Sequence, residues 1–212
     1  HGTKRRDNDF EIDAMGQLVL ITGSNMSGKS TFLRAVGVNA RLALAGAPVC
    51  ATQMSLVNCT LSTSIQVVDN PEEGLSRFYA EVKRLAQTVR AAESAGEGTH
   101  PPCLYLVDEM LSGTNSRERR IASRTIMHRL IKANRSFGLV TTHDLALVSV
   151  EDELPGHIIC THFTDRFDGE NMHFDYLMKP GVAKTTNALH VLRMEGIEVD
   201  DVHVVDSTDA GA

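Results

Sequence analysis

The chain has 212 residues, and a hydrophobic share of 42% with 23% charged residues is ordinary for one globular domain with a full core. Its 27 Asp and Glu residues outnumber its 21 Lys and Arg residues and give a net charge of −6. This balance argues against a strong, general DNA-binding surface, because neutralising phosphates requires clustered basic residues, and the clusters at Lys4–Arg6 and Arg117–Arg120 are short.

No apolar stretch approaches the length that crosses a membrane, so we expect no membrane contact from this chain. The four cysteines show no CxxC spacing, which favours reduced thiols in a cytoplasmic protein. The chain starts at His1 without a methionine, and we expect it to be a fragment of a longer protein.

Strands and helices alternate in the first half of the chain. Residues 18–22 form a short, continuous apolar run, as in a strand covered on both faces. Apolar residues at helical spacing predict a helix over residues 27–45 that stops at Gly46. Alternating Thr, Ser and Val residues predict β structure within residues 54–68, and residues 76–95 carry the apolar face of a second helix.

The second half of the chain continues the alternation of strands and helices and then predicts an antiparallel hairpin. Residues 103–109 read as a buried strand that ends in two carboxylates, and residues 116–134 as a helix with a basic, solvated face. A third buried strand is predicted over residues 137–144. Residues 158–178 predict an antiparallel hairpin that turns at Asp168–Gly169.

We expect residues 185–196 to form a closing helix and residues 201–212 to be a disordered acidic tail, which leaves residues 1–200 as one domain. The order of elements predicts an α/β fold with a mostly parallel sheet flanked by helices. Ligands of such sheets bind beyond the carboxyl ends of the strands. Within the hairpin, His157, Cys160 and His162 could be imagined as a metal site, but alternation along a strand is the preferred interpretation.

The stretch "GSNMSGKS", residues 23–30, fits the phosphate-binding pattern G-x-x-x-x-G-K-[ST] between a strand and a helix. Its glycines let backbone N–H groups curl toward phosphate oxygens, and the helix adds the positive end of its dipole. Lys29 is expected to reach the β- and γ-phosphates, and the Ser30 hydroxyl to bind Mg²⁺. The candidate nucleotide-binding residues are Gly23, Ser24, Asn25, Met26, Ser27, Gly28, Lys29, Ser30 and Thr31.

Acidic and imidazole groups follow the later strands. Asp108 ends a buried strand and can hold Mg²⁺, while the next residue, Glu109, can orient or deprotonate the attacking water. His143 ends the third strand, from where an imidazole can sense the γ-phosphate. Together with the lysine loop, these residues predict a Mg²⁺-dependent ATPase of the ABC-like branch of P-loop NTPases.

Beyond this general pattern, "LITGSNMSGKSTFLRAVGVNARLALAGAPVCA" resembles the ATPase domain of the MutS family of DNA mismatch-repair proteins. In that family the loop reads TG-x-NM-x-GKST, with the Asn-Met pair found here at Asn25 and Met26. "DEMLSGTNSRERR" is similar to the family's DELGRGTST-x-x-G, "TTHDLAL" to ATHFHEL, and "GVAKTTNALHVLRMEGIE" to its closing segment. The similarity runs from about Phe10 to Val199 and looks most like bacterial MutS-related paralogues; Ser24 replaces the family's usual proline.

The resemblance implies roles residue by residue. It places Asn25 beside the γ-phosphate, makes Asp108 and Glu109 the metal and water-activating pair, and makes His143 the switch histidine. It places Ser76 at the serine that reaches the partner subunit's γ-phosphate, although an ordinary helix N-cap explains Ser76 equally. Tyr176 falls where the family holds a ring against adenine, or else is an aromatic residue of the hairpin core.

The resemblance further implies a homodimer closed by ATP, with mismatched or structured DNA bound by domains absent from this chain. Two other interpretations stay open. One is a nucleotide-gated scaffold with negligible turnover, which the intact Asp108 and Glu109 argue against. The other is a repair ATPase of the SMC or RecF type, whose LSGG-like signature "GLSRF" preserves only in part.

Overall fold

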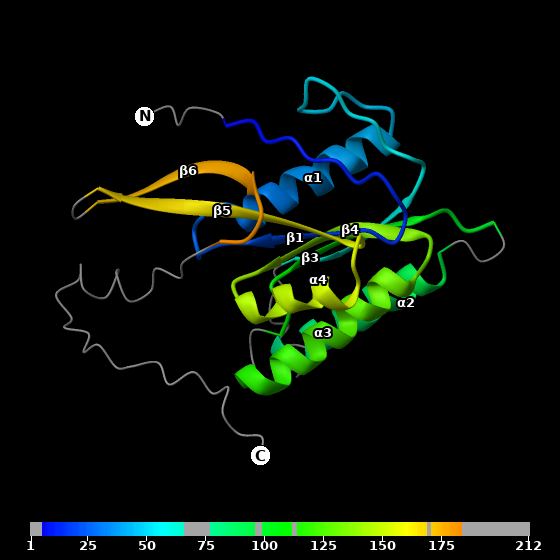
Figure 1. The fold of residues 1–212 in the computed structure, drawn as a ribbon. Helices are drawn as coiled ribbons and strands as arrows, with labels where there is room; N and C mark the ends of the chain where they lie inside the picture. The colour runs from blue at the N-terminus through cyan, green and yellow to red at the C-terminus, as the bar shows by residue number, and fades with distance from the viewer. Residues whose placement is uncertain (1–5, 66–76, 96–98, 112–113, 169–170, 184–212) are drawn as a thin grey trace, which may run out of the picture.

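A computed structural model of the chain describes residues 6–65, 77–95, 99–111, 114–168 and 171–183. At its centre lies a six-stranded sheet with the strand order β2-β3-β4-β1-β5-β6 (Figure 1). All neighbouring strands are parallel except β5 and β6, which form an antiparallel hairpin. The strands are β1 Leu18–Thr22, β2 Thr60–Ser64, β3 Cys103–Asp108, β4 Ser136–Thr142, β5 Ile158–Asp168 and β6 Asn171–Pro180.

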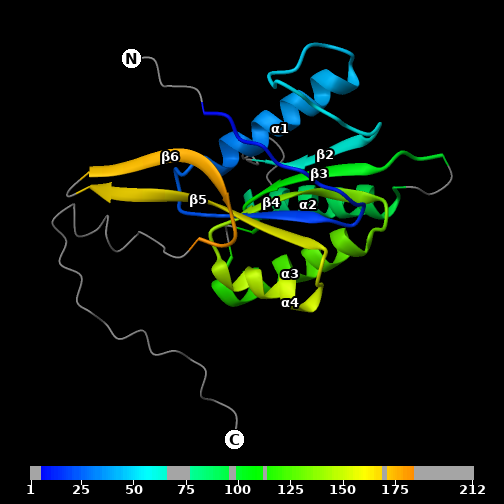
Figure 2. The same cartoon turned by 45° about the horizontal axis from the view of Figure 1, so that its top comes forward.

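Helices cover both faces of the sheet (Figures 1 and 2). Helix α1, Lys29–Leu44, packs on one face. The opposite face carries α2 Arg77–Glu93, α3 Ser116–Lys132, the 3₁₀ helix η2 Leu145–Ser149 and α4 Val150–Glu153. The predicted α/β class, with a mostly parallel sheet between helices, is confirmed.

The central strand β1 shows why its sequence is apolar without alternation. Val19 and Ile21 belong to the core beneath α1, whereas Leu18 and Leu20 belong to the core beneath α2 and α3. Successive side chains of a strand point to opposite faces, so a strand buried on both sides must be apolar at every position.

The β5–β6 hairpin extends beyond the rest of the sheet, and the N-terminal segment of residues 6–15 runs beside it (Figures 1 and 2). Asn8 fastens the two together, because its side-chain amide donates to the Tyr176 carbonyl at 3.0 Å and accepts from the Met178 N–H at 2.7 Å. These contacts hold β6 at a position where Tyr176 has a φ of 55°, in the left-handed region.

The predicted elements differ from the observed ones in a few places. Within residues 54–65 only β2 is a strand; residues 54–59 lack regular structure there. The short helices η2 and α4 were not predicted, because four or five residues are too few to show a helical period. The side chain of Asp144 caps the N-terminus of η2 by accepting a hydrogen bond from the Ala146 N–H. The predicted helix at 185–196, the tail at 201–212 and Gly169 in the hairpin turn lie outside the described residues.

Gly138 lies where β3 and β4 approach each other closely, and a substitution at this position tests that packing. A Cβ atom at this position would lie 2.1 Å from the Tyr105 carbonyl oxygen and 2.4 Å from Cδ2 of its buried ring. We expect Gly138→Ala to lower the free energy of unfolding in urea by about 3 kcal/mol, because neither backbone nor buried ring can yield cheaply.

Gly46→Ala is the matched control for Gly138→Ala. Gly46 has a φ of +71° but no atom within 4 Å of the added Cβ, so only backbone strain of about 1 kcal/mol is expected. Equal losses in the two variants would contradict the packing account.

Candidate functional site

Residues 23–28 form the loop between β1 and α1, and two of its glycines have conformations that other residues resist. Gly23 has a φ of 143°, and a Cβ there would lie 2.6 Å from the Phe163 carbonyl oxygen. Gly28 has a φ of 107° and stands directly before α1. The loop can therefore curl over the start of the helix only with glycine at both positions.

Lys29, the first residue of α1, points back into this loop, and its side chain is only 4% exposed. Its ammonium donates to the carbonyls of Gly23 at 2.9 Å and Ser24 at 2.8 Å, and Glu109 Oε1 lies 3.6 Å away. Burial lowers the pKa of Lys29, while the Glu109 carboxylate counteracts that shift. The loop thus holds a nearly buried cation through oxygen atoms alone.

Asp108 at the end of β3 joins α1 and β4. Its Oδ1 accepts hydrogen bonds from Ser30 Oγ at 3.0 Å and from Thr141 Oγ1 at 2.7 Å. Thr141 lies opposite Asp108 in the strand register, and its hydroxyl also accepts from the Glu109 N–H at 3.1 Å. Thr141 was not among the predicted site residues.

Glu109 sits where β3 turns away from the sheet, with a φ of 45°. Its Oε1 lies 3.4 Å from His143 Nδ1, a close electrostatic contact without the alignment of a hydrogen bond. His143 and Lys29 hold the pKa of Glu109 below its usual range, against the opposite effect of burial. The carboxylate is therefore ionised at neutral pH, between two basic groups.

The remaining loop residues differ in exposure. Asn25, Met26 and Thr31 are exposed, with Met26 at 82% and in a left-handed conformation, whereas Ser27 is buried. The Ser24 hydroxyl donates to Asp165 Oδ2 on β5 at 3.0 Å, a contact that sequence reasoning missed and that tethers the loop where the family's motif has proline.

Tyr176 lies beside the loop although 148 residues separate it from Gly28 in the chain. A Cβ on Gly28 would be 3.2 Å from Tyr176 Cδ1, and the Tyr176 ring, which is 45% exposed, stacks on Phe174. The ring is therefore partly exposed beside the loop and also packs on the hairpin, and its role in binding a base stays a prediction. Ser76 lies outside the described residues.

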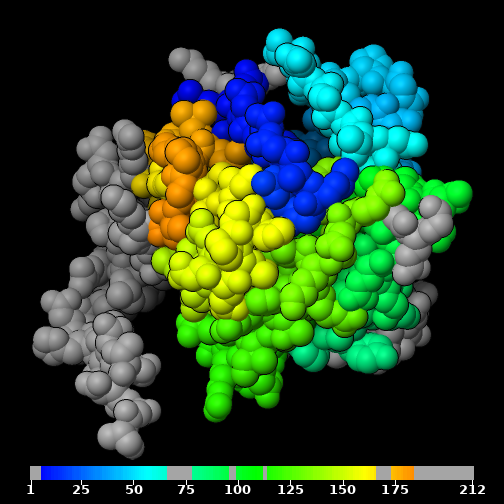
Figure 3. Space-filling model, turned by 45° about the vertical axis from the view of Figure 1, so that its right-hand side comes forward, coloured from blue at the N-terminus to red at the C-terminus, as the bar shows by residue number. Residues whose placement is uncertain are grey.

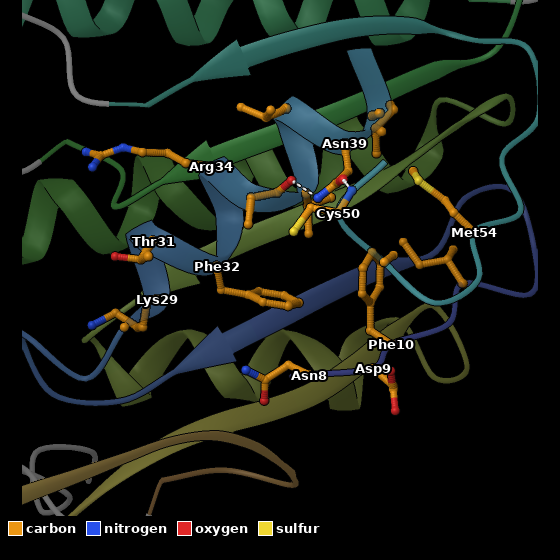
Figure 4. Close-up of a pocket in the computed structure, with 18 of the residues that line it drawn as sticks. Asn8, Asp9, Phe10, Lys29, Thr31, Phe32, Arg34, Asn39, Cys50 and Met54 are labelled. Carbon is orange, nitrogen blue, oxygen red and sulfur yellow. Dashed lines mark hydrogen bonds between the residues drawn. The ribbon is translucent and has the colours of Figure 1, made fainter. Parts of the chain in front are cut away.

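A groove runs from the loop along α1, between residues 6–15 and residues 50–57; the space-filling view shows the hollow between these segments (Figure 3). Figure 4 shows Lys29 and Thr31 at one end and Met54 at the other. The Phe10 and Phe32 rings meet edge to face at 5.6 Å between their centres. Phe10 was not predicted as part of the site, since nothing in the local sequence marks it.

The residues around the loop fit a magnesium nucleotide. A hydroxyl and a carboxylate already share a hydrogen bond at Ser30 and Asp108, and oxygen ligands of this kind are those that Mg²⁺ prefers. The ammonium of Lys29 is held by two carbonyls that phosphate oxygens can replace.

His157, Cys160 and His162 lie at or within β5, as the strand interpretation predicted. Each side chain has its own partner: His157 contacts the Gly16 carbonyl, Cys160 contacts Glu151 and His162 contacts the Gly181 carbonyl. Within the described ranges, no three His, Cys, Asp or Glu side chains are grouped as metal ligands. Nor does any helix in those ranges combine the length and apolarity needed to cross a bilayer.

Comparison with known proteins places this arrangement in one family. The family model "MutS domain V" matches residues 19–208, which includes the loop, both carboxylates, the histidine and the hairpin. The chain belongs to the MutS domain V family. The P-loop fold and the MutS resemblance expected from the sequence are thereby confirmed.

Curated relatives agree with this assignment. The chain is 29% identical over 192 residues to "DNA mismatch repair protein MutS 2" of Halobacterium salinarum, covering 90% of this chain and 21% of that protein. It is 28% identical over 191 residues to "DNA mismatch repair protein MutS" of Natronomonas pharaonis, covering 90% and 21%. It is 28% identical over 194 residues to "Endonuclease MutS2" of Thermomicrobium roseum, covering 91% and 23%. The chain thus spans about a fifth of the length of these relatives.

The Thr141 hydroxyl provides a test of the junction at Asp108. Thr141→Val keeps the shape of the side chain but removes the donor to Asp108 and the acceptor for the Glu109 N–H. We expect a loss of about 1 kcal/mol in the free energy of unfolding, because Asp108 loses one of its two hydroxyl donors while the Glu109 N–H keeps its bond to the Thr141 carbonyl at 3.2 Å. Thr125→Val is the control, since its hydroxyl bonds the Ile121 carbonyl on an exposed helix face; an equal loss there would contradict the account.

Proposed function

We propose that this chain binds Mg²⁺ and ATP and hydrolyses ATP to ADP and phosphate, as the nucleotide-driven part of a MutS-like mismatch-repair or DNA-processing protein. The observation that carries the proposal is the convergence of Lys29, the Ser30–Asp108 pair and Glu109 at one edge of the sheet. Membership of the MutS domain V family supports the same activity.

The phosphates would bind to the loop and the start of α1. Lys29 would exchange its bonds to the Gly23 and Ser24 carbonyls for bonds to phosphate oxygens, and the loop N–H groups and helix dipole would add further positive potential. The open groove beside Gly28 leaves room for the rest of the nucleotide, with Tyr176 at its wall.

Mg²⁺ would be held by Ser30 Oγ and Asp108, with Thr141 fixing the orientation of the carboxylate. When bound, the ion supplies charge neutralisation on the phosphate oxygens. The protein's part is to keep both oxygen ligands preformed at the strand end, which the hydrogen bonds to Asp108 accomplish.

Glu109 would accept a proton from the attacking water. A carboxylate whose pKa is lowered by His143 and Lys29 is fully ionised at neutral pH, so it orients a water before it accepts the proton. His143 lies close enough to Glu109 to sense its charge, and 40% of its side chain remains exposed toward solvent.

Partners follow from the relatives. The curated relatives are described as mismatch-repair proteins and as an endonuclease, and the chain spans about a fifth of each. We therefore propose that DNA is bound by other parts of the parent protein. We further propose that ATP closes a homodimer across two nucleotide sites, with Ser76 contributing to the partner's site, and that the protein works in the cytoplasm.

A scaffold that binds nucleotide without turning it over requires Lys29 but not an oriented base. The contacts of Glu109 favour hydrolysis over this alternative, because the loop lysine, the strand-end carboxylate and the imidazole would otherwise have no reason to converge.

Steady-state phosphate release distinguishes the two. The wild type is expected to release phosphate from ATP only with Mg²⁺, Lys29→Ala to lose binding and release, and Glu109→Gln to bind ATP with release reduced by at least about 10²-fold. Light scattering should show that ATP traps Glu109→Gln as a dimer. No release by the wild type would contradict hydrolysis, release equal to that of Glu109→Gln would contradict the role of Glu109, and monomers in saturating ATP would contradict dimer closure.

A further inference from the structure

The phosphate-binding loop contacts strand β5 at two successive residues. A Cβ on Gly23 would lie 2.6 Å from the Phe163 carbonyl oxygen, and the Ser24 hydroxyl donates to Asp165 Oδ2 at 3.0 Å. The function proposed above assigns no role to the Asp165 carboxylate.

The β5–β6 hairpin is irregular where it meets the loop. Phe163 pairs with Met178 but Asp165 pairs with Phe174, so residues 175–177 of β6 stand opposite the single residue Thr164. Lys179 pins this bulge, because its ammonium donates to Thr164 Oγ1 at 2.7 Å and also contacts Asp175. Bulges of this kind redirect side chains beside functional sites, and here the residue that follows the bulge on β5 is Asp165.

Ser24 connects the Asp165 carboxylate to the Lys29 ammonium. Its hydroxyl donates to Asp165, and its carbonyl accepts from Lys29 Nζ at 2.8 Å. With one serine between them, the carboxylate oxygen and the ammonium are no more than about 11 Å apart. Burial lowers the pKa of Lys29, and Asp165 is among the carboxylates that counteract this shift, so its charge reaches the ammonium.

The charge of Asp165 is not neutralised by a basic side chain among those that the structure describes. The partner of its carboxylate there is the neutral Ser24 hydroxyl, and Lys179 on the neighbouring strand pairs with Asp175 instead. A carboxylate without a counter-ion therefore lies behind the loop that holds Lys29.

We propose that Asp165 is a specificity-determining residue of the nucleotide site, whose charge limits the affinity for nucleotide according to the charge of the phosphates. A carboxylate that attracts the Lys29 ammonium repels an anion that binds to the same ammonium. Mg·ATP carries two net negative charges and Mg·ADP carries one, so the repulsion lowers the affinity for ATP more than that for ADP. This inference rests on the proposed binding of Mg²⁺ and nucleotide at the loop.

Ser24 is the residue that holds the carboxylate against the loop. The family's motif has proline at this position, and proline has no hydroxyl to donate. The Ser24–Asp165 contact is therefore a departure of this chain from the motif, at the loop residue whose carbonyl binds Lys29.

The test is titration calorimetry of Mg·ATP and Mg·ADP into the wild type and Asp165→Asn. The asparagine keeps an oxygen that can accept from Ser24 and removes only the charge. At about 50 mM NaCl we expect Asp165→Asn to bind Mg·ATP about threefold more tightly than the wild type, and Mg·ADP more tightly by a smaller factor. Both gains should shrink in about 500 mM NaCl, because salt screens the repulsion.

Asp152→Asn is the control for net charge, since Asp152 is exposed on α4 at the opposite face of the sheet, and it should leave both affinities unchanged. Ser24→Ala keeps the charge and removes the tether, so it should not tighten binding. Equal or weaker binding of Mg·ATP by Asp165→Asn, or the same tightening in Ser24→Ala, would overturn this inference and leave the proposed function standing. If folded wild type and Asp165→Asn both bind no nucleotide, the proposed function fails and this inference fails with it.

Discussion

The site depends on one electrostatic constraint: an ammonium group held almost wholly inside the protein. Burying a cation is costly unless hydrogen bonds and an opposite charge compensate it. Lys29 receives both, from the Gly23 and Ser24 carbonyls and from Glu109. The pKa of Lys29 is lowered, so the effect of burial on the pKa outweighs the opposite effect of these contacts. A further anion, such as a phosphate, would therefore stabilise the charged form of the lysine.

The parallel sheet brings the other groups to that ammonium. β1, β3 and β4 are neighbours in the order β3-β4-β1, so residues that follow their carboxyl ends meet at one edge although the chain separates them widely. Asp108 is then fixed by hydroxyls from α1 and β4, and Glu109 lies between Lys29 and His143. The geometry of the site therefore follows from the strand order of the parallel sheet more than from any single long-range contact.

The sequence was most informative where the pattern is local. The loop, its flanking strand and helix, and the carboxylates at a strand end are contiguous runs whose chemistry can be read directly. Contacts between distant segments were not predictable: Thr141 reaches Asp108 across a strand pair, and Asn8 fastens β6 beside the loop. Arg119 was assigned to the basic, solvated face of its helix, whereas its Nε is shielded from solvent. Helical spacing could not reveal this, because it does not show which other segments of the fold pack against that face of the helix.

The proposed binding of Mg²⁺ and ATP would give these contacts a common purpose, and membership of the MutS domain V family supports that proposal. The most direct measurement is titration calorimetry of Mg²⁺·ATP into the wild type and into Lys29→Met, a replacement of similar length that suits a buried position. The account predicts saturable heat from the wild type and none from the variant, with both proteins folded. No heat from folded wild type, or equal heat from both, would contradict it.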